Sequence, residues 1–264
     1  MSDQPVAVIS GASRGIGAAA AQAFAQAGYR LAIVATNDAA LQSVAEKLAA
    51  PCLVMAGDLA DLAFTETIVP QTVARFGRVD VLVNNAAWRE LSSMRRITVD
   101  NWERTLRICL TAPAFLARWA AEDMERRKYG VILNVSSMMA LQTAGISPAY
   151  VACKGGLDAL TYELASVYGP SGIRAVSIQP GAIDTELSRD LESADSPDEL
   201  RQYSEDMIML GRWGRPEEVA DLLVFFASDR ASYITGTTLT IDGGWLRQHF
   251  PLSLKRRHFA SDFP

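Results

Sequence analysis

Short apolar runs alternate with longer amphipathic stretches along the whole chain. The runs rich in β-branched residues predict seven strands, at Val6–Ser10, Arg30–Ala35, Cys52–Ala56, Val79–Val83, Val131–Val135, Ala175–Ile178 and Thr238–Ile241. Helical patterns lie between them, for example in Ile16–Ala27, Ala40–Ala49 and Thr65–Phe76. Strands that are apolar throughout and separated by helices are typical of a parallel sheet covered on both faces. The expected fold is α/β, a single doubly wound Rossmann domain with a seven-stranded parallel sheet.

No internal repeat or linker interrupts the alternation, so residues 1–264 are expected to form one domain. Two segments break the rhythm. Residues 187–210 are rich in Asp, Glu and Ser, which favours a substrate lid; a surface excursion of two short helices is the alternative. The C-terminal tail, 246–264, carries Lys255-Arg256-Arg257 and several aromatic residues. A solvated end is its simplest interpretation, packing on a neighbouring subunit is the main alternative, and membrane or nucleic-acid binding is the least favoured.

Composition narrows the class of protein. About half of the 264 residues are apolar, enough for a sizeable core, and the net charge of −5 argues against nucleic acid as a partner. No apolar run approaches the ~20 residues of a membrane span, and Val6–Ile9 is too short for the apolar region of a signal peptide. The scattered cysteines Cys52, Cys109 and Cys153 favour reduced thiols in a cytoplasmic protein over a disulfide framework.

A glycine-rich loop follows the first strand and opens the next helix. It reads Ser10-Gly11-Ala12-Ser13-Arg14-Gly15-Ile16-Gly17. Glycines permit a tight turn and a close approach of the backbone to a pyrophosphate, and the helix N-terminus offers free N–H groups and a favourable dipole. A turn with a purely structural role would need only one of these glycines. Because the loop also lies directly after the first strand, near the N-terminus, it predicts nucleotide binding.

The spacing G-x-x-x-G-x-G resembles that of the short-chain dehydrogenase/reductase family, and the resemblance extends over nearly all of 5–245. Further family motifs follow in order: Asp58, Asn84-Asn85-Ala86-Ala87, Ser136-Ser137, Tyr150-x-x-x-Lys154, Pro180-Gly181-Ala182-Ile183-Asp184-Thr185, Gly211-Arg212-Trp213-Gly214-Arg215-Pro216-Glu217-Glu218 and Ile241-Asp242-Gly243-Gly244. The pattern looks closest to 3-oxoacyl-carrier-protein reductase-like members, although sugar, steroid and small-alcohol dehydrogenases share its motifs.

The resemblance implies where a nicotinamide cofactor would bind. Adenine is expected beside Asp58 and Leu59, and the adenosine ribose and the nicotinamide side along Asn85, Ala86 and Ala87. Ala87 stands where the family usually has Gly. The nicotinamide ring and its carboxamide are expected at Pro180, Gly181, Ile183 and Thr185. The other expected cofactor contacts are Gly11, Ser13, Arg14, Gly15, Ile16, Gly17, Tyr150 and Lys154.

The end of the second strand bears on the choice between NADP and NAD. An acidic residue there would accept a hydrogen bond from a free 2′-hydroxyl and repel a 2′-phosphate, but the sequence continues Thr36-Asn37. Asp38 lies further on and is expected to cap the next helix. Arg14 could pair with a phosphate, and Thr36 and Asn37 could donate from a hydroxyl and an amide. NADP is therefore expected, with NAD as the alternative.

Three residues are candidates for catalysis. Tyr150 and Lys154 are four apart, so on a helix they share one face, and Pro148 is a plausible start for that helix. An ammonium beside a tyrosine stabilises its phenolate, which suits proton exchange with a carbonyl oxygen. Ser137 could donate a hydrogen bond to the same oxygen. A Tyr-Lys pair alone is usually an ordinary surface pair; with Ser137 and the nucleotide loop it predicts an active site.

One position departs from the family. The stretch Ile108-Cys109-Leu110-Thr111 stands where the family usually has a sequence like Val-Asn-Leu-Thr, whose Asn position helps to hold a water that links the lysine to solvent. If a backbone carbonyl at Cys109 holds that water, the water can still link the lysine to solvent. If an Asn side chain is needed to fix the local backbone, turnover should fall, because Cys is a weak hydrogen-bonding group. A reactive thiol is a further alternative, and an apolar buried cysteine is the more common case.

The remaining candidates are weaker. His249 and His258 have no Cys or carboxylate cluster near them, so no metal site is expected. Trp88 could cover the mouth of the pocket or pack at an interface, and it is followed by Arg89 and Glu90. An apolar substrate pocket is expected from Met138, Met139, Gln142, Thr143, Met207, Ile208 and Met209, although core packing also explains the methionines.

The sequence thus predicts an NADP-dependent carbonyl reductase or alcohol dehydrogenase that acts on a small-molecule substrate by reversible hydride transfer. Tyr150 would be the general acid and base, Lys154 would tune it and bind the ribose, and Ser137 would orient the carbonyl. A non-catalytic NADP(H)-sensing protein and a dehydratase of the same fold are the alternatives. The resemblance also suggests a homotetramer or homodimer, with the helices containing Cys109 and Tyr150 in the interface.

Overall fold

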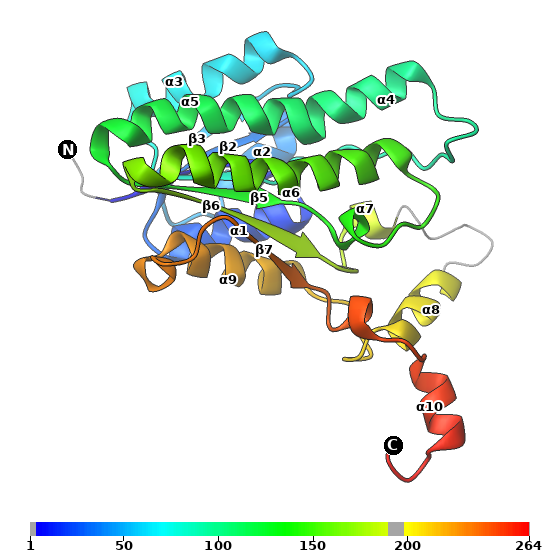
Figure 1. Cartoon of the computed structure of the whole chain (residues 1–264). Helices are drawn as coiled ribbons and strands as arrows, with labels where there is room; N and C mark the ends of the chain where they lie inside the picture. The colour runs from blue at the N-terminus through cyan, green and yellow to red at the C-terminus, as the bar shows by residue number, and fades with distance from the viewer. Residues whose placement is uncertain (1–3, 190–197, 264) are drawn as a thin grey trace.

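The computed structural model describes residues 4–189 and 198–263. Its strands form one parallel sheet in the order β3-β2-β1-β4-β5-β6-β7 (Figure 1). They are β1 (Val6–Ser10), β2 (Arg30–Ala35), β3 (Cys52–Ala56), β4 (Val81–Asn84), β5 (Gly130–Val135), β6 (Ile173–Pro180) and β7 (Thr237–Ile241). The strand order reverses between β1 and β4, and ligands bind at such a switch point beyond the carboxyl ends of the strands. The predicted seven-stranded, doubly wound α/β fold is confirmed.

Helices cover both faces of the sheet, which explains why its central strands are apolar throughout (Figure 1). One face packs on α1 (Gly15–Gln26), α2 (Asp38–Ala45) and α9 (Pro216–Ala227). The other packs on α3 (Leu62–Phe76), α5 (Ala112–Arg127) and α6 (Pro148–Tyr168). Within β1, Ala7 and Ile9 belong to the first core and Val8 to the second, so alternate side chains serve opposite layers.

Helix α4 (Val99–Leu106) continues into α5 through a π-helical turn, Arg107–Thr111. Such a turn inserts a residue into the helical ladder, and π turns are frequent at functional sites. Cys109 lies inside it and is fully buried. The turn therefore sets the direction in which this cysteine and its neighbours point.

The segment after β6 forms α7 (Glu186–Arg189) and α8 (Glu199–Met207), and residues 190–197 of the expected lid lie outside the described residues. The C-terminal tail includes a short helix, α10 (Leu252–His258), that lies near α8 (Figure 1). Ser253 donates from its backbone N–H and its hydroxyl to the carboxylate of Asp206, each at 2.6 Å. This part of the tail thus contacts α8 of its own chain, although no residue of α10 is buried.

None of the helices that the structure describes is both long and apolar enough to cross a bilayer.

Candidate active site

A cavity of about 780 Å³ opens beyond the carboxyl ends of the central strands. The glycine loop, the Asn-Asn-Ala-Ala turn and the loop after β6 line it together with Ser137, Tyr150 and Lys154. Most of the cofactor contacts expected from the sequence are on its wall, namely Gly11, Ser13, Arg14, Gly15, Ile16, Thr36, Asp58, Leu59, Asn85, Ala86, Ala87, Tyr150, Lys154, Pro180, Gly181, Ile183 and Thr185. Gly17 and Asn37 are not among the lining residues.

The glycine loop has the shape that a pyrophosphate needs. Gly11 and Gly15 have φ of +67° and +53°, a left-handed conformation that favours glycine. Arg14 precedes α1 and makes no side-chain hydrogen bond to its first turn. The N–H groups of that turn therefore have no side-chain cap from Arg14, and the helix dipole adds positive potential. The residues present fit the diphosphate of a dinucleotide.

Gly17 supports this loop from behind rather than facing the cavity. A Cβ atom on Gly17 would lie 2.1 Å from the carbonyl oxygen of Gly11 and 2.6 Å from Nδ2 of Asn85. Gly17 thus packs closely under the loop and is not among the residues that line the cavity.

Asn85 ties the glycine loop to the turn after β4. Its Nδ2 donates to the carbonyl oxygens of Ser10 at 3.0 Å and Gly11 at 3.1 Å. The Ser10 hydroxyl oxygen in turn accepts the backbone N–H groups of Asn85 and Ala86, each at 3.1 Å. These two segments of the cavity wall are thus fixed to one another by hydrogen bonds within the protein.

The end of β2 differs from the expectation in one respect. Thr36 is on the cavity wall, but Asn37 is the residue that caps α2, where its Oδ1 accepts the N–H of Ala40 at 3.0 Å. Asp38 is already the first residue of the helix, so the prediction of Asp38 as the cap is wrong. Asn and Asp cap equally well, and sequence alone does not fix which of two neighbours stands at the boundary.

Asp58 is held by two neighbours that no sequence motif pairs with it. Its carboxylate accepts the N–H of Ala60 at 2.9 Å and forms an ion pair with Arg104 at 2.8 Å. Partial burial alone would raise the pKa of Asp58, but the Ala60 N–H and the Arg104 guanidinium together hold it below its usual value. Arg104 also lies 5.5 Å above the ring of Trp88 and joins the cavity wall. No sequence motif surrounds Arg104 on α4, so the sequence did not indicate that this residue lines the cavity.

Helix α6 presents Tyr150 and Lys154 on one face, as their spacing predicts. The ammonium of Lys154 lies 5.3 Å from the centre of the Tyr150 ring and donates to the carbonyl oxygen of Val135 at 2.6 Å. Ser136 donates from its hydroxyl to the carbonyl oxygen of Lys154 at 3.0 Å, which fixes the helix to the end of β5. Lys154 is only 2% exposed, so its charge acts in a poorly solvated setting.

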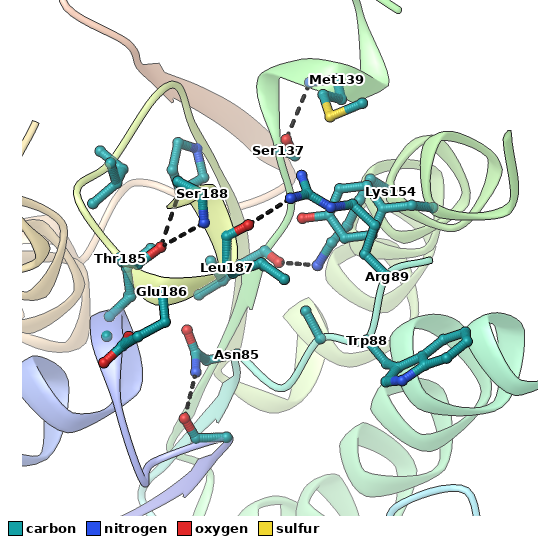
Figure 2. Close-up of a pocket in the computed structure, with 18 of the residues that line it drawn as sticks. Asn85, Trp88, Arg89, Ser137, Met139, Lys154, Thr185, Glu186, Leu187 and Ser188 are labelled. Carbon is teal, nitrogen blue, oxygen red and sulfur yellow. Dashed lines mark hydrogen bonds between the residues drawn. The ribbon is translucent and has the colours of Figure 1, made fainter. Parts of the chain in front are cut away.

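Ser137 stands directly after β5 on the same wall. Its oxygen accepts the N–H of Met139 at 3.1 Å, as Figure 2 shows, so its own O–H remains a donor. Serine, tyrosine and lysine together offer two hydroxyl groups and one ammonium beside a space large enough for a dinucleotide and a small molecule. This arrangement can polarise a carbonyl oxygen and exchange a proton with it.

Comparison with known proteins agrees with this geometry. A family model described as enoyl-(acyl carrier protein) reductase matches residues 11–246. The L-rhamnose 1-dehydrogenase (NAD(P)(+)) of Sphingomonas sp. is 39% identical over 90% of this chain and 94% of its own, and the 3-oxoacyl-[acyl-carrier-protein] reductase of Escherichia coli is 31% identical over 90% and 96%. A solved short-chain type dehydrogenase/reductase from Mycobacterium marinum superposes with a TM-score of 0.85, at 32% identity over 91% and 95% of the two chains.

The chain belongs to the short-chain dehydrogenase/reductase family. It is an NAD(P)-dependent oxidoreductase. The resemblance read from the ordered motifs is thereby confirmed.

In this short-chain dehydrogenase/reductase the substrate side of the cavity differs from the expectation. Met138, Met139, Gln142 and Thr143 line it, but Met207, Ile208 and Met209 do not. Ile208 is buried against Gly243, and Met209 packs on Gly244. Leu200, Tyr203 and Ser204 of α8 line the cavity instead, because the helix turns that face toward it. Trp213 and Trp245 complete this side, and only the former belonged to a recognised motif.

Cys109 has a defined structural task at the position where the family usually has Asn. Its thiol donates to the carbonyl oxygen of Trp88 and its sulfur accepts the N–H of the same residue, each at 3.4 Å. Burial raises the pKa of the Cys109 thiol, so it stays protonated at neutral pH and can donate. The interpretation as a reactive thiol is disfavoured, since the thiolate is the nucleophile. The side chain at position 109 thus fixes the backbone of Trp88, and it does so through a sulfur atom.

Replacing Cys109 tests how much this double contact contributes. Cys109→Ala removes both hydrogen bonds and leaves the N–H and C=O of Trp88 without them, so we expect kcat to fall about 3- to 10-fold and the free energy of unfolding by about 1–2 kcal/mol. Cys109→Asn restores a donor and an acceptor and should leave activity equal or higher. Steady-state rates and thermal unfolding check both. A large loss of kcat in Cys109→Asn alone would show that the enzyme needs the thiol itself.

Proposed function

We propose that this enzyme catalyses reversible hydride transfer between NADP(H) and a small alcohol or carbonyl substrate, with Tyr150 as general acid and base. The observation that carries the proposal is that one cavity is lined by the glycine loop and by Ser137, Tyr150 and Lys154. A dinucleotide on the loop and a carbonyl beside the tyrosine would share one space. The chemistry of hydride donation or acceptance is supplied by the nicotinamide when it is bound.

The side chains of this chain would do the rest. Tyr150 gives a proton to the carbonyl oxygen on reduction and removes it on oxidation. Ser137 donates a hydrogen bond to the same oxygen and stabilises the charge that develops there. Lys154 stabilises the phenolate that Tyr150 leaves behind, because an ammonium in a poorly solvated site interacts strongly with a nearby anion. The described parts of the expected lid, 187–189 and 198–210, serve to cover the cavity, a role supported by the lining residues Leu187, Ser188, Leu200, Tyr203 and Ser204.

The test is a panel of ketones, aldehydes, aldoses and 3-oxoacyl thioesters with NADPH or NADH, followed by the absorbance of the reduced nicotinamide. At least one substrate should be turned over by the wild type and none at a comparable rate by Tyr150→Phe. Equal background rates for both proteins on every substrate would contradict the proposal and favour a sensor of NADP(H). Product without a stoichiometric change in cofactor would indicate dehydratase chemistry.

NADP is the proposed cofactor because the ribose end of the cavity has a cation and no carboxylate at the end of β2. Arg14 and Thr36 line the cavity there, and Asn37 is occupied in capping α2. A 2′-phosphate would gain a charge-assisted contact with the guanidinium.

Thr36→Asp tests this preference. A carboxylate at position 36 would repel a 2′-phosphate and accept a hydrogen bond from a free 2′-hydroxyl, so we expect kcat/KM for NADPH to fall about 10- to 100-fold and that for NADH to stay within about threefold. Thr36→Ser, which keeps the hydroxyl, should behave like the wild type. A variant that loses both cofactors equally would show that position 36 does not select between them.

Assembly and compartment complete the proposal. A homotetramer or homodimer through α5 and α6 is supported by large apolar side chains exposed on these helices, namely Phe115, Tyr162 and Val167. A cytoplasmic location is supported by the free state of Cys52, Cys109 and Cys153. Light scattering of the purified protein gives the subunit number directly.

A further inference from the structure

An arginine reaches into the catalytic half of the cavity. Arg89 follows the turn after β4, and its Cζ lies 5.9 Å from the centre of the Tyr150 ring. Figure 2 shows its side chain crossing the cavity toward Ser137, with the guanidinium hydrogen-bonded to the carbonyl oxygen of Leu187 on α7. The proposed reaction with a neutral carbonyl gives this cation no task.

The backbone around Arg89 is fixed relative to Tyr150. The N–H of Ser92 donates to the carbonyl oxygen of Ile146 at 2.8 Å, and the hydroxyl of Ser147 donates to the carbonyl oxygen of Glu90 at 3.5 Å. Ser147 immediately precedes α6, the helix that carries Tyr150. The loop that carries Arg89 and the helix that carries Tyr150 are thus held together, as the supports of two recognition groups for one small molecule must be.

The other charged residues of the described cavity wall lie away from its substrate side or hydrogen-bond within the protein, as Arg89 itself does with Leu187. Arg104 pairs with Asp58 on the adenosine side, and Arg14 belongs to the glycine loop. Glu186 lies beside that loop, since its carboxylate would be 3.9 Å from a Cβ on Gly15. The ammonium of Lys154 donates a hydrogen bond to the carbonyl oxygen of Val135. The substrate side otherwise presents uncharged residues, among them Met138, Met139, Gln142 and Ile146.

We infer that Arg89 binds a carboxylate group of the substrate, so that the enzyme acts on keto acids and the corresponding hydroxy acids. The inference rests on the proposed function and names its substrate class. A planar guanidinium matches a carboxylate in geometry, because the two groups can form two parallel hydrogen bonds. Its five N–H groups allow the bond to Leu187 to persist beside a contact with the substrate. Charge-assisted bonds of this kind are about twice as strong as neutral ones.

The position of Arg89 limits the spacing between the two groups. One small molecule must reach Arg89 with its carboxylate and Tyr150 with its carbonyl oxygen, and these side chains are in contact range of each other. The carboxylate is therefore separated from the reacting carbon by a few bonds. In the reaction the ketone carbon gains the hydride of the reduced nicotinamide, the oxygen gains the proton of Tyr150, and the carboxylate is unchanged.

The test compares acids with their neutral esters. The probes are 3-oxobutanoate, 4-oxopentanoate and 4-oxocyclohexanecarboxylate, each against its methyl ester, with NADPH. We expect the wild type to prefer at least one acid over its ester by tenfold or more in kcat/KM. Arg89→Gln should lower kcat/KM for that acid about 10- to 100-fold, mainly through KM, and change the ester by no more than about twofold. Arg89→Lys should keep part of the preference.

Arg96→Gln is the matched control, because it removes the same charge from an exposed position of the same loop outside the cavity wall. It should retain the full preference for the acid. Equal treatment of every acid and ester by the wild type would overturn the inference. An equal loss for acid and ester in Arg89→Gln would also overturn it and assign Arg89 to holding Leu187 alone.

Failure of the inference and failure of the proposed function can be told apart. Tryptophan fluorescence measures binding of each acid and ester to the wild type and to Arg89→Gln in the presence of NADP⁺, without turnover. Acid-selective binding that Arg89→Gln abolishes supports the carboxylate site even if no probe is reduced. Absence of selective binding in the wild type contradicts the site whatever the rates are.

Discussion

Tyr150→Phe is expected to lower kcat about 10²- to 10⁴-fold, the range that a positioned general acid or base contributes. The substitution removes one hydroxyl group and leaves the ring. That ring is 7% exposed and packs in a small cluster with Ile108, Cys109 and Cys153, so the fold should not change. The affinity for NADPH, measured by its fluorescence on binding, should stay within about threefold. The measurement is the rate of NADPH oxidation on the best substrate of the panel.

Tyr233→Phe is the matched control for this variant. Tyr233 is fully exposed and is not among the residues that line the cavity. It should lose the same atom without losing turnover. If the Tyr150→Phe protein keeps more than a tenth of the wild-type rate, another group must donate the proton. Ser137 would be the first candidate to test.

The fold was predictable because its signals are local. Each central strand is a continuous apolar run, since alternate side chains enter two different cores, as Ala7 and Val8 do. Helix boundaries were less certain where several capping residues are adjacent. Asp61 caps α3 by accepting the N–H of Ala63 at 2.9 Å, so this helix starts at Leu62 rather than at Thr65.

The site was predictable only as far as its motifs extend. The glycine loop, Ser137 and the Tyr150–Lys154 pair stand at fixed spacings, and the structure brings them to one cavity. The contacts of Arg89 and Arg104 depend instead on where loops and helices cross in space. Arg89 meets Leu187, which is 98 residues away in the chain, and no periodicity carries that information. The use of the Cys109 thiol to hold Trp88 likewise becomes visible only when both backbones are placed.

Gly17→Ala is expected to disable the cofactor site and to destabilise the protein by about 3 kcal/mol or more. Gly17 lies in the first turn of α1, where its conformation suits any residue, so the effect is purely one of space. The new Cβ would lie 2.1 Å from the carbonyl oxygen and 2.7 Å from the carbonyl carbon of Gly11, and 2.6 Å from Nδ2 of Asn85. Two of these are backbone atoms of the glycine loop, which cannot move aside without changing the loop.

The loss should therefore appear both in stability and in cofactor binding. Displacing Gly11 would also strain the hydrogen bonds that Asn85 makes to the loop, since Asn85 contacts both Ser10 and Gly11. We expect the midpoint of thermal unfolding to fall by about 6–12 °C, on the scale of 2–4 °C per kcal/mol for a domain of this size. Binding of NADPH, measured by its fluorescence, should weaken more than tenfold.

Gln22→Ala, an exposed change on the same helix, should stay within about 0.5 kcal/mol of the wild type. A Gly17→Ala protein with wild-type stability and cofactor affinity would mean that the loop can shift freely, and close packing under it would then not be what holds the diphosphate site in shape.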